Sequence, residues 1–371
     1  MKYLALLICL SFLISNSASA QKDTVWKTKP TVNLSVFADV FYVYDFGRPK
    51  TSYRQKFLYN HNRHNEFNLN LGLIKFNVNH SKYRANLALQ VGTYVADNYA
   101  NEPVALKNIS EANIGLSLSK RDRVWLDVGI LPSHIGFESA ISKENLTLTR
   151  SLSAENSPYF EAGAKLSFKP NEKLELAAFA LNGWQRIQRV SGNSILSFGT
   201  QVGITPNNKL LINWSTFIGT IDPDISRRMR YFSNIYAHWK KSKYFTLIAG
   251  FDIGAQQVKK DSSAYNIWLT PTLIGQLKLN SKWKTALRIE YFKDDAGILL
   301  PTNPINGTRI LGFSMNFDYS PTPNLVCRFE GRWLSGAGYY FTNKNGISQE
   351  NFILGGSIAF AFMEQLAVSK K

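Results

Sequence analysis

Apolar and polar residues alternate along segment after segment of this 371-residue chain, and this pattern restricts the fold more than any other feature. In one segment, apolar Leu311, Phe313 and Met315 are separated by Gly312 and Ser314. Successive side chains of a β-strand point to opposite faces, so alternation over about ten residues predicts a strand with one apolar and one polar face. We place sixteen such strands, beginning near residues 32, 66, 83, 111, 123, 159, 174, 195, 210, 228, 244, 264, 283, 307, 325 and 350.

The second predicted strand departs from this pattern, because its apolar face changes between Leu73 and Ile74. One extra residue in a strand would cause such a change, so we expect a β-bulge there. Helical periodicity is scarce, and beyond the first twenty residues no apolar run approaches the roughly 18 residues of a membrane-spanning helix. The chain is therefore predicted to be all-β.

Short and long connections alternate between the predicted strands. The short ones are rich in residues of tight turns and lie at 79–82, 119–122, 169–173, 206–209, 240–243, 280–282 and 321–324. The long ones lie near 46–65, 97–110, 132–158, 185–194, 220–227, 256–263, 293–306 and 335–349. Because this sorting is typical of outer-membrane barrels, we predict a transmembrane antiparallel β-barrel of about 16 strands, with short periplasmic turns and long extracellular loops.

A barrel of this width cannot be filled by the side chains of its wall, and its apolar outer face requires lipid. We therefore expect a polar, water-filled lumen. Aromatic residues near the predicted strand ends fit the two interfaces of a membrane, and they include Tyr42, Tyr44, Phe168, Trp184, Trp239, Phe245, Trp283, Tyr291, Tyr319 and Trp333.

The first twenty residues have the features of a cleaved signal peptide. A basic start precedes an apolar core, and small residues end the segment at Ala18–Ala20. We divide the rest into a periplasmic N-terminal tail (residues 21–30), the barrel (31–362) and a C-terminal tail (363–371). Cleavage would leave Cys327 as one cysteine, which cannot form an internal disulfide. The expected location is the cell outer membrane.

Several short motifs, spread over nearly the whole chain, resemble the OmpL-like family of outer-membrane β-barrel porins. They are YNHNRHNEFNL at 59–69, LPSHIGFE at 131–138, RSL at 150–152, SPYFEAG at 157–163, NGWQ at 182–185 and RIEYF at 288–292. The resemblance implies a pore-forming barrel, without naming its solutes.

Strand alternation also selects charged residues that face the lumen. The predicted pore-lining residues are Arg84, Lys165, Lys284, Arg288, Glu290, Arg328, Glu330 and Arg332. They would either filter ions as a charged rim or form ion pairs that hold the wall together. The loop at 132–158 is the longest, and we expect it to fold inward and narrow the pore. Its residues most worth testing are His134, Glu138 and Arg150, and an extracellular cap is the alternative.

Other classes of site have weak support. His61 and His64 lie in a predicted loop without a further evident ligand, so we expect no metal and no cofactor. No phosphate-binding loop or nucleophile motif is found, and nucleic-acid binding lacks both a motif and a compartment. An outer-membrane hydrolase would need a nucleophile beside a histidine, and His238 is the inward strand histidine that we find. We therefore predict that the chain is not an enzyme.

The predicted function is an outer-membrane porin that passes small hydrophilic solutes by passive diffusion. The alternative is a structural or adhesive barrel with a closed lumen, because bulky residues are predicted to point inward, namely Phe37, Phe41, Trp125, Phe179, Trp268 and Phe292. The expected partners are outer-membrane lipid and the solutes, with a homo-oligomer as an open alternative to a monomer.

The net charge of +17 lies mostly outside the predicted wall. The strands hold equal numbers of acidic and basic residues, whereas the short turns and tails hold most of the excess. The first long loop adds Arg48, Lys50, Arg54, Lys56 and Arg63 without an acid before Glu66. We therefore predict at most weak anion selectivity, unless this first loop folds inward.

Overall fold

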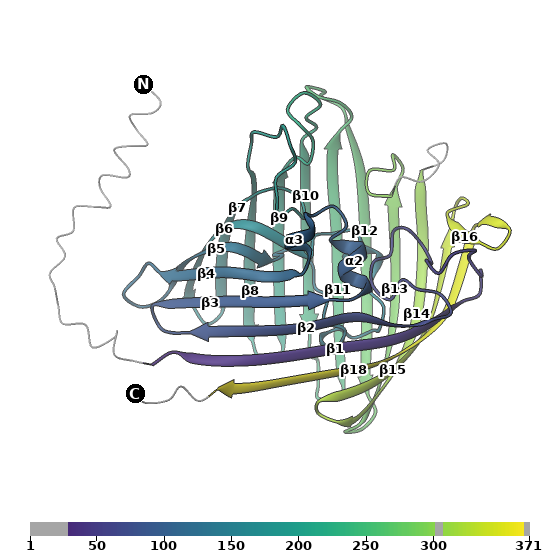
Figure 1. Cartoon of the computed structure of the whole chain (residues 1–371), viewed down its shortest axis with the longest axis horizontal. Coiled ribbons are helices and arrows are strands. Elements are labelled where there is room, and N and C mark those ends of the chain that lie inside the picture. The colour runs from purple at the N-terminus through teal and green to yellow at the C-terminus, as the bar shows by residue number, and fades with distance from the viewer. Residues whose placement is uncertain (1–28, 301–306, 367–371) are drawn as a thin grey trace.

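The computed structural model describes residues 29–300 and 307–366, so the predicted signal peptide lies outside the described residues. Within the described part, sixteen antiparallel strands form a closed barrel (Figure 1). They are β1 (Thr31–Asp45), β2 (Phe67–Asn79), β3 (Tyr83–Val91), β4 (Ile109–Ser117), β5 (Val124–Pro132), β6 (Phe160–Asn171), β7 (Leu174–Leu181), β8 (Ser197–Asn207), β9 (Leu210–Gly219), β10 (Arg230–Trp239), β11 (Phe245–Gln257), β12 (Tyr265–Lys278), β13 (Trp283–Asp294), β14 (Thr308–Thr322), β15 (Leu325–Gly336) and β18 (Glu350–Leu366).

Each strand pairs with its neighbour in sequence, and β18 pairs with both β15 and β1 to close the barrel. Two further strands, β16 (Phe341–Asn343) and β17 (Gly346–Ser348), form a small hairpin in the last long loop. The predicted strand starts lie within two residues of the observed ones, so the barrel and its strand number are confirmed. Strand β18 continues to Leu366, four residues beyond the predicted end of the barrel at 362.

The inward and outward faces of the strands also follow the alternation of residues in the sequence. In β1, Phe37, Asp39, Phe41 and Val43 are buried inside the barrel, whereas Val40 is 47% exposed on the outer face. Large apolar residues stay exposed around the outer face of the barrel, as lipid contact requires. Trp184 was expected at the membrane interface, and this prediction is wrong. It is buried inside the barrel against Phe217 and Phe232, because the loop after β7 folds inward.

The predicted bulge in β2 is misplaced. The register between β1 and β2 shifts between Asp39 and Val40, which leaves Asn70 as the extra residue. Leu71 and Leu73 therefore point inward, and the change of face between Leu73 and Ile74 is ordinary alternation. Sequence alone favoured the later position because it assumed that apolar side chains avoid the lumen.

Within the described ranges, four short helices lie in the long loops: α2 (Thr93–Asn98), α3 (Val104–Lys107), the 3₁₀ turn η2 (Ser142–Glu144) and α4 (Leu152–Glu155). The loop between β3 and β4 thus begins at Gly92, earlier than predicted, and holds α2. Tyr94 and Val95 of α2 pack on Leu71 and Leu73 of the wall, which explains why these leucines face inward. No described helix is long and apolar enough to cross a membrane.

The lumen is partly filled by loops rather than open throughout. Three buried clusters join inward wall residues to inward loops, and each includes inward aromatics predicted from the sequence: Phe37 in one, Phe292 in the second, and Phe179 and Trp268 in the third. These rings are therefore surfaces on which loops pack. Side chains cannot fill a barrel of sixteen strands, but folded loops can.

Candidate functional site

Charged side chains of β13 and β15 meet inside the barrel, across the intervening strand β14. Glu290 Oε1 lies 3.2 Å from Arg288 Nε and 2.6 Å from Arg332 Nη2. Glu330 Oε1 lies 3.1 Å from Arg288 Nη2. The space over β14 is open because the residue there is Gly312, whose Cβ would lie only 2.7 Å from Glu290 Cγ. These four charged residues, which we call the wall cluster, are nearly free of solvent contact.

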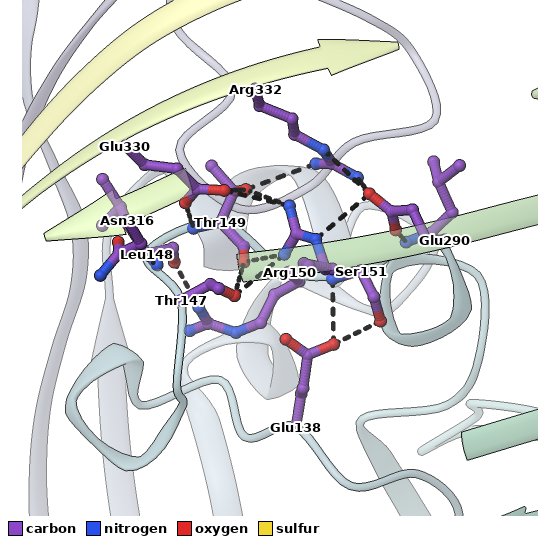
Figure 2. Close-up of polar contacts among 12 residues, drawn as sticks. Glu138, Thr147, Leu148, Thr149, Arg150, Ser151, Glu290, Asn316, Glu330 and Arg332 are labelled. Carbon is purple, nitrogen blue, oxygen red and sulfur yellow. Dashed lines mark hydrogen bonds and ion pairs between the residues drawn. The ribbon is translucent and has the colours of Figure 1, made fainter. Parts of the chain in front are cut away.

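The segment between β5 and β6, residues 133–159, folds into the barrel and covers the wall cluster (Figure 2). We call it the inner loop. Thr149 donates from its N–H to Glu330 Oε2 at 2.6 Å and from its hydroxyl to Glu330 Oε1 at 2.8 Å. The N–H of Leu152 donates to Glu290 Oε2 at 2.6 Å. Backbone and hydroxyl donors of the inner loop therefore occupy both wall carboxylates.

The inner loop extends through the barrel to its periplasmic end. Lys143 Nζ donates to Pro323 O at 2.6 Å, in the turn between β14 and β15. On the wall nearby, Arg328 pairs with Asp318 at 3.0 Å and donates to three carbonyls of the inner loop, those of Ser142, Asn145 and Thr147. One guanidinium can bind several carbonyls because it carries five N–H donors in a fixed fork. This side of the lumen is thus filled from the mouth to the periplasmic turns.

Two of the residues singled out in this loop, Glu138 and Arg150, fix its shape. Arg150 is fully buried and donates to the carbonyls of Ser139, Ala140 and Leu148 at 2.6–2.8 Å. Glu138 accepts hydrogen bonds from the N–H and the hydroxyl of Ser151 (Figure 2). The inner loop is therefore held by its own polar side chains as well as by the wall.

The third residue, His134, anchors the start of the inner loop to the wall. Its Nδ1 lies 2.9 Å from Glu161 Oε2, its Nε2 lies 2.8 Å from Thr216 O, and its ring stacks on Phe179 at 4.1 Å. Both ring nitrogens therefore lie within hydrogen-bond distance of oxygen atoms of the wall. Gly199 makes room for the ring, because a Cβ there would lie 2.6 Å from His134 Nε2.

The first loop, residues 46–66, also folds inward. His61 Nε2 lies 2.8 Å from Asp39 Oδ2 of the wall. The N–H groups of Tyr59 and Asn60 donate to the two carboxylate oxygens of Glu155, at 2.8 and 3.3 Å, so the first loop contacts α4 of the inner loop. Burial raises the pKa of Glu155 to about 7, although these donors and nearby arginines favour its charged form.

Weak anion selectivity was predicted on the condition that the first loop stays outside the lumen. Because this loop folds inward, the surroundings of its five cations matter. Arg63 pairs with Asp97 at 2.6 Å, and Arg54 lies 3.8 Å from Asp45, so two of the five cations have acidic neighbours. Burial lowers the pKa of Arg54 to about 10. The remaining cations of this loop are exposed, namely Arg48, Lys50 and Lys56.

The histidines of the first loop do not converge. His61 contacts Asp39, whereas His64 Nδ1 accepts the backbone N–H of Asp45. In the described part of the chain, no group of three or more His, Cys, Asp or Glu residues is arranged to hold a metal ion. His238 lies opposite Leu211 and Ile248 in the sheet, neither of which is a nucleophile.

The remaining predicted wall residues keep part of their surface exposed. Arg84 pairs with Asp127 through two contacts of 2.5 and 2.6 Å and stacks over Trp125 at 4.4 Å. Lys165 lies 4.0 Å from Glu175, and Lys284 is half-buried. The predicted wall residues therefore separate into a group under the inner loop, formed by the wall cluster and Arg328, and a partly exposed group.

Polar side chains also face the lumen on the wall between β2 and β10. An asparagine ladder crosses β2, β3 and β4, in which Asn77 donates to Asn86 and Asn86 to Asn113 at 2.5 and 2.7 Å. Above it, Lys75 pairs with Glu111 at 2.5 Å. Sequence reasoning missed Lys75 because the misplaced bulge obscured the facing of β2; the alternation beyond Asn70 would have identified it.

A cavity of about 320 Å³ lies above this ladder. It is bounded by the first residues of the inner loop, by the Lys75–Glu111 pair on one wall and by Tyr236 of β10 on the other. Tyr236 contacts Phe137 of the inner loop with ring centroids 5.7 Å apart. The inner loop therefore narrows the lumen at this cavity, and the wall opposite the loop carries the Lys75–Glu111 ion pair.

Comparison with known proteins places the chain among porins. A family model described as "Putative beta-barrel porin-2, OmpL-like" matches residues 31–362. No curated protein matches the sequence.

Solved porin structures share the fold at low sequence identity. The anion-selective porin from Comamonas acidovorans is 8% identical, with a TM-score of 0.61 over 90% of this chain and 100% of that one. The outer membrane channel DcaP of Acinetobacter baumannii is 12% identical, with a TM-score of 0.59 over 90% and 98%. The trimer form of OmpT, an outer membrane protein of Vibrio cholerae, is 8% identical, with a TM-score of 0.60 over 90% and 100%.

Proposed function

This chain belongs to the family described as "Putative beta-barrel porin-2, OmpL-like", and we propose that it passes small hydrophilic solutes by passive diffusion along one side of its lumen. It is a porin of the cell outer membrane. The proposed path runs beside β2–β10, past the Lys75–Glu111 pair and the asparagine ladder. The single observation that carries this proposal is the row of polar side chains on that wall, since the inner loop covers the charged side chains of β13 and β15.

Thiol accessibility in planar bilayers tests the path. In a Cys327→Ser background, Asn86→Cys places a thiol on the proposed path, whereas Ser314→Cys places a matched inward thiol under the inner loop. A charged thiol reagent should reduce the conductance of the Asn86→Cys channel stepwise and leave the Ser314→Cys channel unchanged. Block through Ser314→Cys alone would place the path on the other side.

The same bilayers test the second candidate function, a structural or adhesive barrel with a closed lumen. The filled side of the barrel favours it, because loops there reach from the mouth to the periplasmic turns. Correctly folded protein that never conducts would support the closed barrel and contradict the diffusion path.

We further propose that small-ion selectivity is at most weakly anionic even though the first loop folds inward, because two of the five cations of that loop have acidic neighbours. The inward charges beside the path occur largely in pairs, Lys75 with Glu111 and Arg84 with Asp127, and paired charges attract neither ion strongly. Reversal potentials in a salt gradient should therefore stay near zero. A strongly anion-selective value would mean that the cations at the mouth control permeation.

A homo-oligomer is the proposed assembly. Its support is the likeness to the Vibrio cholerae protein solved in a trimer form. Native mass spectrometry of detergent-extracted protein should show a multiple of the protomer mass, and a monomer alone would contradict the proposal.

A further inference from the structure

A second cavity, of about 240 Å³, lies at the outer mouth of the barrel. Its lining includes Arg230 at the outer end of β10, Trp184, Arg186, Tyr59 and Glu155. Polar surface predominates in this lining, in contrast to the apolar grooves on the lipid-facing side. Sites for drug-sized ligands span roughly 300–1,000 Å³, so this cavity suits a smaller molecule.

Arg230 is the unusual group in this cavity, because it is buried without an acidic partner. Only 3% of its surface is exposed. Its Nε and Nη2 both donate to Gln256 Oε1, at 2.9 and 2.6 Å. Its Nη1 makes no hydrogen bond to any residue that the structure describes. Burying a cation costs free energy unless the cation is paired. A bound anion would therefore stabilise Arg230 in this position.

The carboxylates whose charge reaches Arg230 are already engaged elsewhere. They belong to Asp222 and Asp294. Asp222 holds Arg228 through two contacts of 2.8 and 3.1 Å. Asp294 accepts backbone N–H groups from the three residues 298–300. Among described residues, no carboxylate lies within 4.0 Å of the Arg230 guanidinium.

Two tryptophans fix the guanidinium in place. Its Cζ lies 5.0 Å from the ring centroid of Trp184 and 5.4 Å from that of Trp268. Trp268 lies flat against the wall because the residue beneath it is Gly254, where a Cβ would lie 1.9 Å from the indole ring. Cation–π contacts hold an arginine in position without neutralising its charge. The cation is therefore preorganised and its charge is available.

We propose that this cavity binds the carboxylate group of small organic acids through Arg230, before they enter the diffusion path. The inference rests on the proposed porin function and names the solute class that the mouth recognises. The carboxylate would accept from Nη1, and the walls formed by Trp184 and Tyr59 would contact the organic part. Arginine suits this role because its planar fork matches carboxylate geometry.

Calorimetric titration with benzoate tests the site directly, in chloride-matched buffer and with benzyl alcohol as the uncharged comparison. The folded protein should bind benzoate and not benzyl alcohol, and Arg230→Gln should weaken benzoate binding at least tenfold. The matched control is Arg309→Gln, which removes an exposed arginine from the same end of the barrel. It should bind benzoate as the unaltered protein does.

Arg230→Lys keeps the positive charge but lacks the planar guanidinium group. It provides a second test of the site in case Arg230→Gln fails to fold. Its affinity should lie between those of the unaltered protein and Arg230→Gln, with heat-modifiable mobility as the check on folding. Absence of benzoate binding by the unaltered protein, or equal binding by folded Arg230→Gln, would overturn the inference. Conductance of the same samples separates the outcomes, because a conducting channel without benzoate binding leaves the porin function intact.

Discussion

At the scale of single residues, buried arginines and carboxylates hold loops inside this barrel. Arg328 contacts three carbonyls of the inner loop and Asp318 at the same time. Glu330 accepts from the backbone and the hydroxyl of Thr149, 181 residues away in sequence. Such contacts are costly to break, because each broken contact leaves a buried polar or charged group without one of its hydrogen-bond partners.

Arg328→Met should therefore release the periplasmic end of the inner loop. It leaves Asp318 unpaired and three carbonyls without their donor, so the free energy of unfolding should fall by about 3–5 kcal/mol. Denaturant titration in detergent measures this loss, and open-channel current noise should rise. Arg309→Met, at an exposed pair, should change neither quantity, and a similar effect from both variants would contradict the argument.

Glu155 should make the contact between the first loop and the inner loop depend on pH. Burial raises the pKa of this loop carboxyl from 4.5 to about 7, so the folded state binds the proton more tightly than the unfolded chain. Its contribution to stability is full below pH 4.5 and is lost as the pH rises to about 7, a difference of about 3 kcal/mol.

Glu155→Gln should remove this pH dependence, because the amide keeps a hydrogen-bond acceptor but cannot ionise. Unfolding midpoints measured between pH 4.5 and 8 for both proteins provide the comparison. The variant should be the more stable protein at pH 8. If the unfolding midpoint changed equally with pH in both proteins, a group other than Glu155 would be responsible for the pH dependence.

At the scale of elements, the strands depend on glycines where neighbouring backbones come close. Gly129 of β5 and Gly163 of β6 lie opposite each other, and both have positive φ values, 135° and 157°. A Cβ at Gly129 would lie 2.1 Å from Ala112 O, and one at Gly163 would lie 2.0 Å from Ala180 O. Backbone atoms cannot move aside as flexible side chains can, so larger residues are excluded at both positions.

Gly129→Ala should consequently impair barrel formation. The added methyl group meets a backbone carbonyl in a conformation that L-residues rarely adopt. We expect loss of the heat-modifiable, folded form in gel electrophoresis after refolding. The control is Gly203→Ala on β8, where a Cβ would come no closer than 3.9 Å to another residue. This variant should fold normally.

At the scale of the whole molecule, the positive charge gathers at the periplasmic rim. Three adjacent turns contain no acid, and their lysines are all exposed: Lys209, Lys240, Lys241, Lys243, Lys278 and Lys282. Backbone hydrogen bonds connect these turns, from Lys240 N to Lys209 O and from Lys278 N to Tyr244 O, both at 2.7 Å. Trp239 and Tyr244 stay exposed beside them, under the ammonium groups of Lys241 and Lys243.

This lysine patch should retain anionic phospholipid of the inner leaflet. Each lysine near a charged membrane surface contributes about 1 kcal/mol, so replacing Lys209, Lys241, Lys243 and Lys282 by Gln should reduce the number of phosphatidylglycerol molecules seen by native mass spectrometry. The control replaces Lys82 and Lys169, which already pair with Asp122 and Glu172. Equal retention by both variants would contradict a specific patch.

The sequence by itself determined the barrel, its strand number, the end at which the long loops lie and the facing of most wall residues. These features are local, because side chains alternate with every residue and turns are short. The inward position of Arg288, Glu290, Glu330 and Arg332 follows from alternation alone, and Arg230 could have been found by the same parity that placed His238 inside.

Only the tertiary structure decided what fills the lumen. The inner loop meets the wall cluster across more than 100 residues of sequence, and no periodicity records such pairings. The same applies to the bulge at Asn70 and to Trp184, whose positions depend on loops that pack against them. Alternation along a strand determines which way a wall side chain points. The partner of that side chain depends on how distant loops fold, because the lumen is too wide for wall side chains to fill.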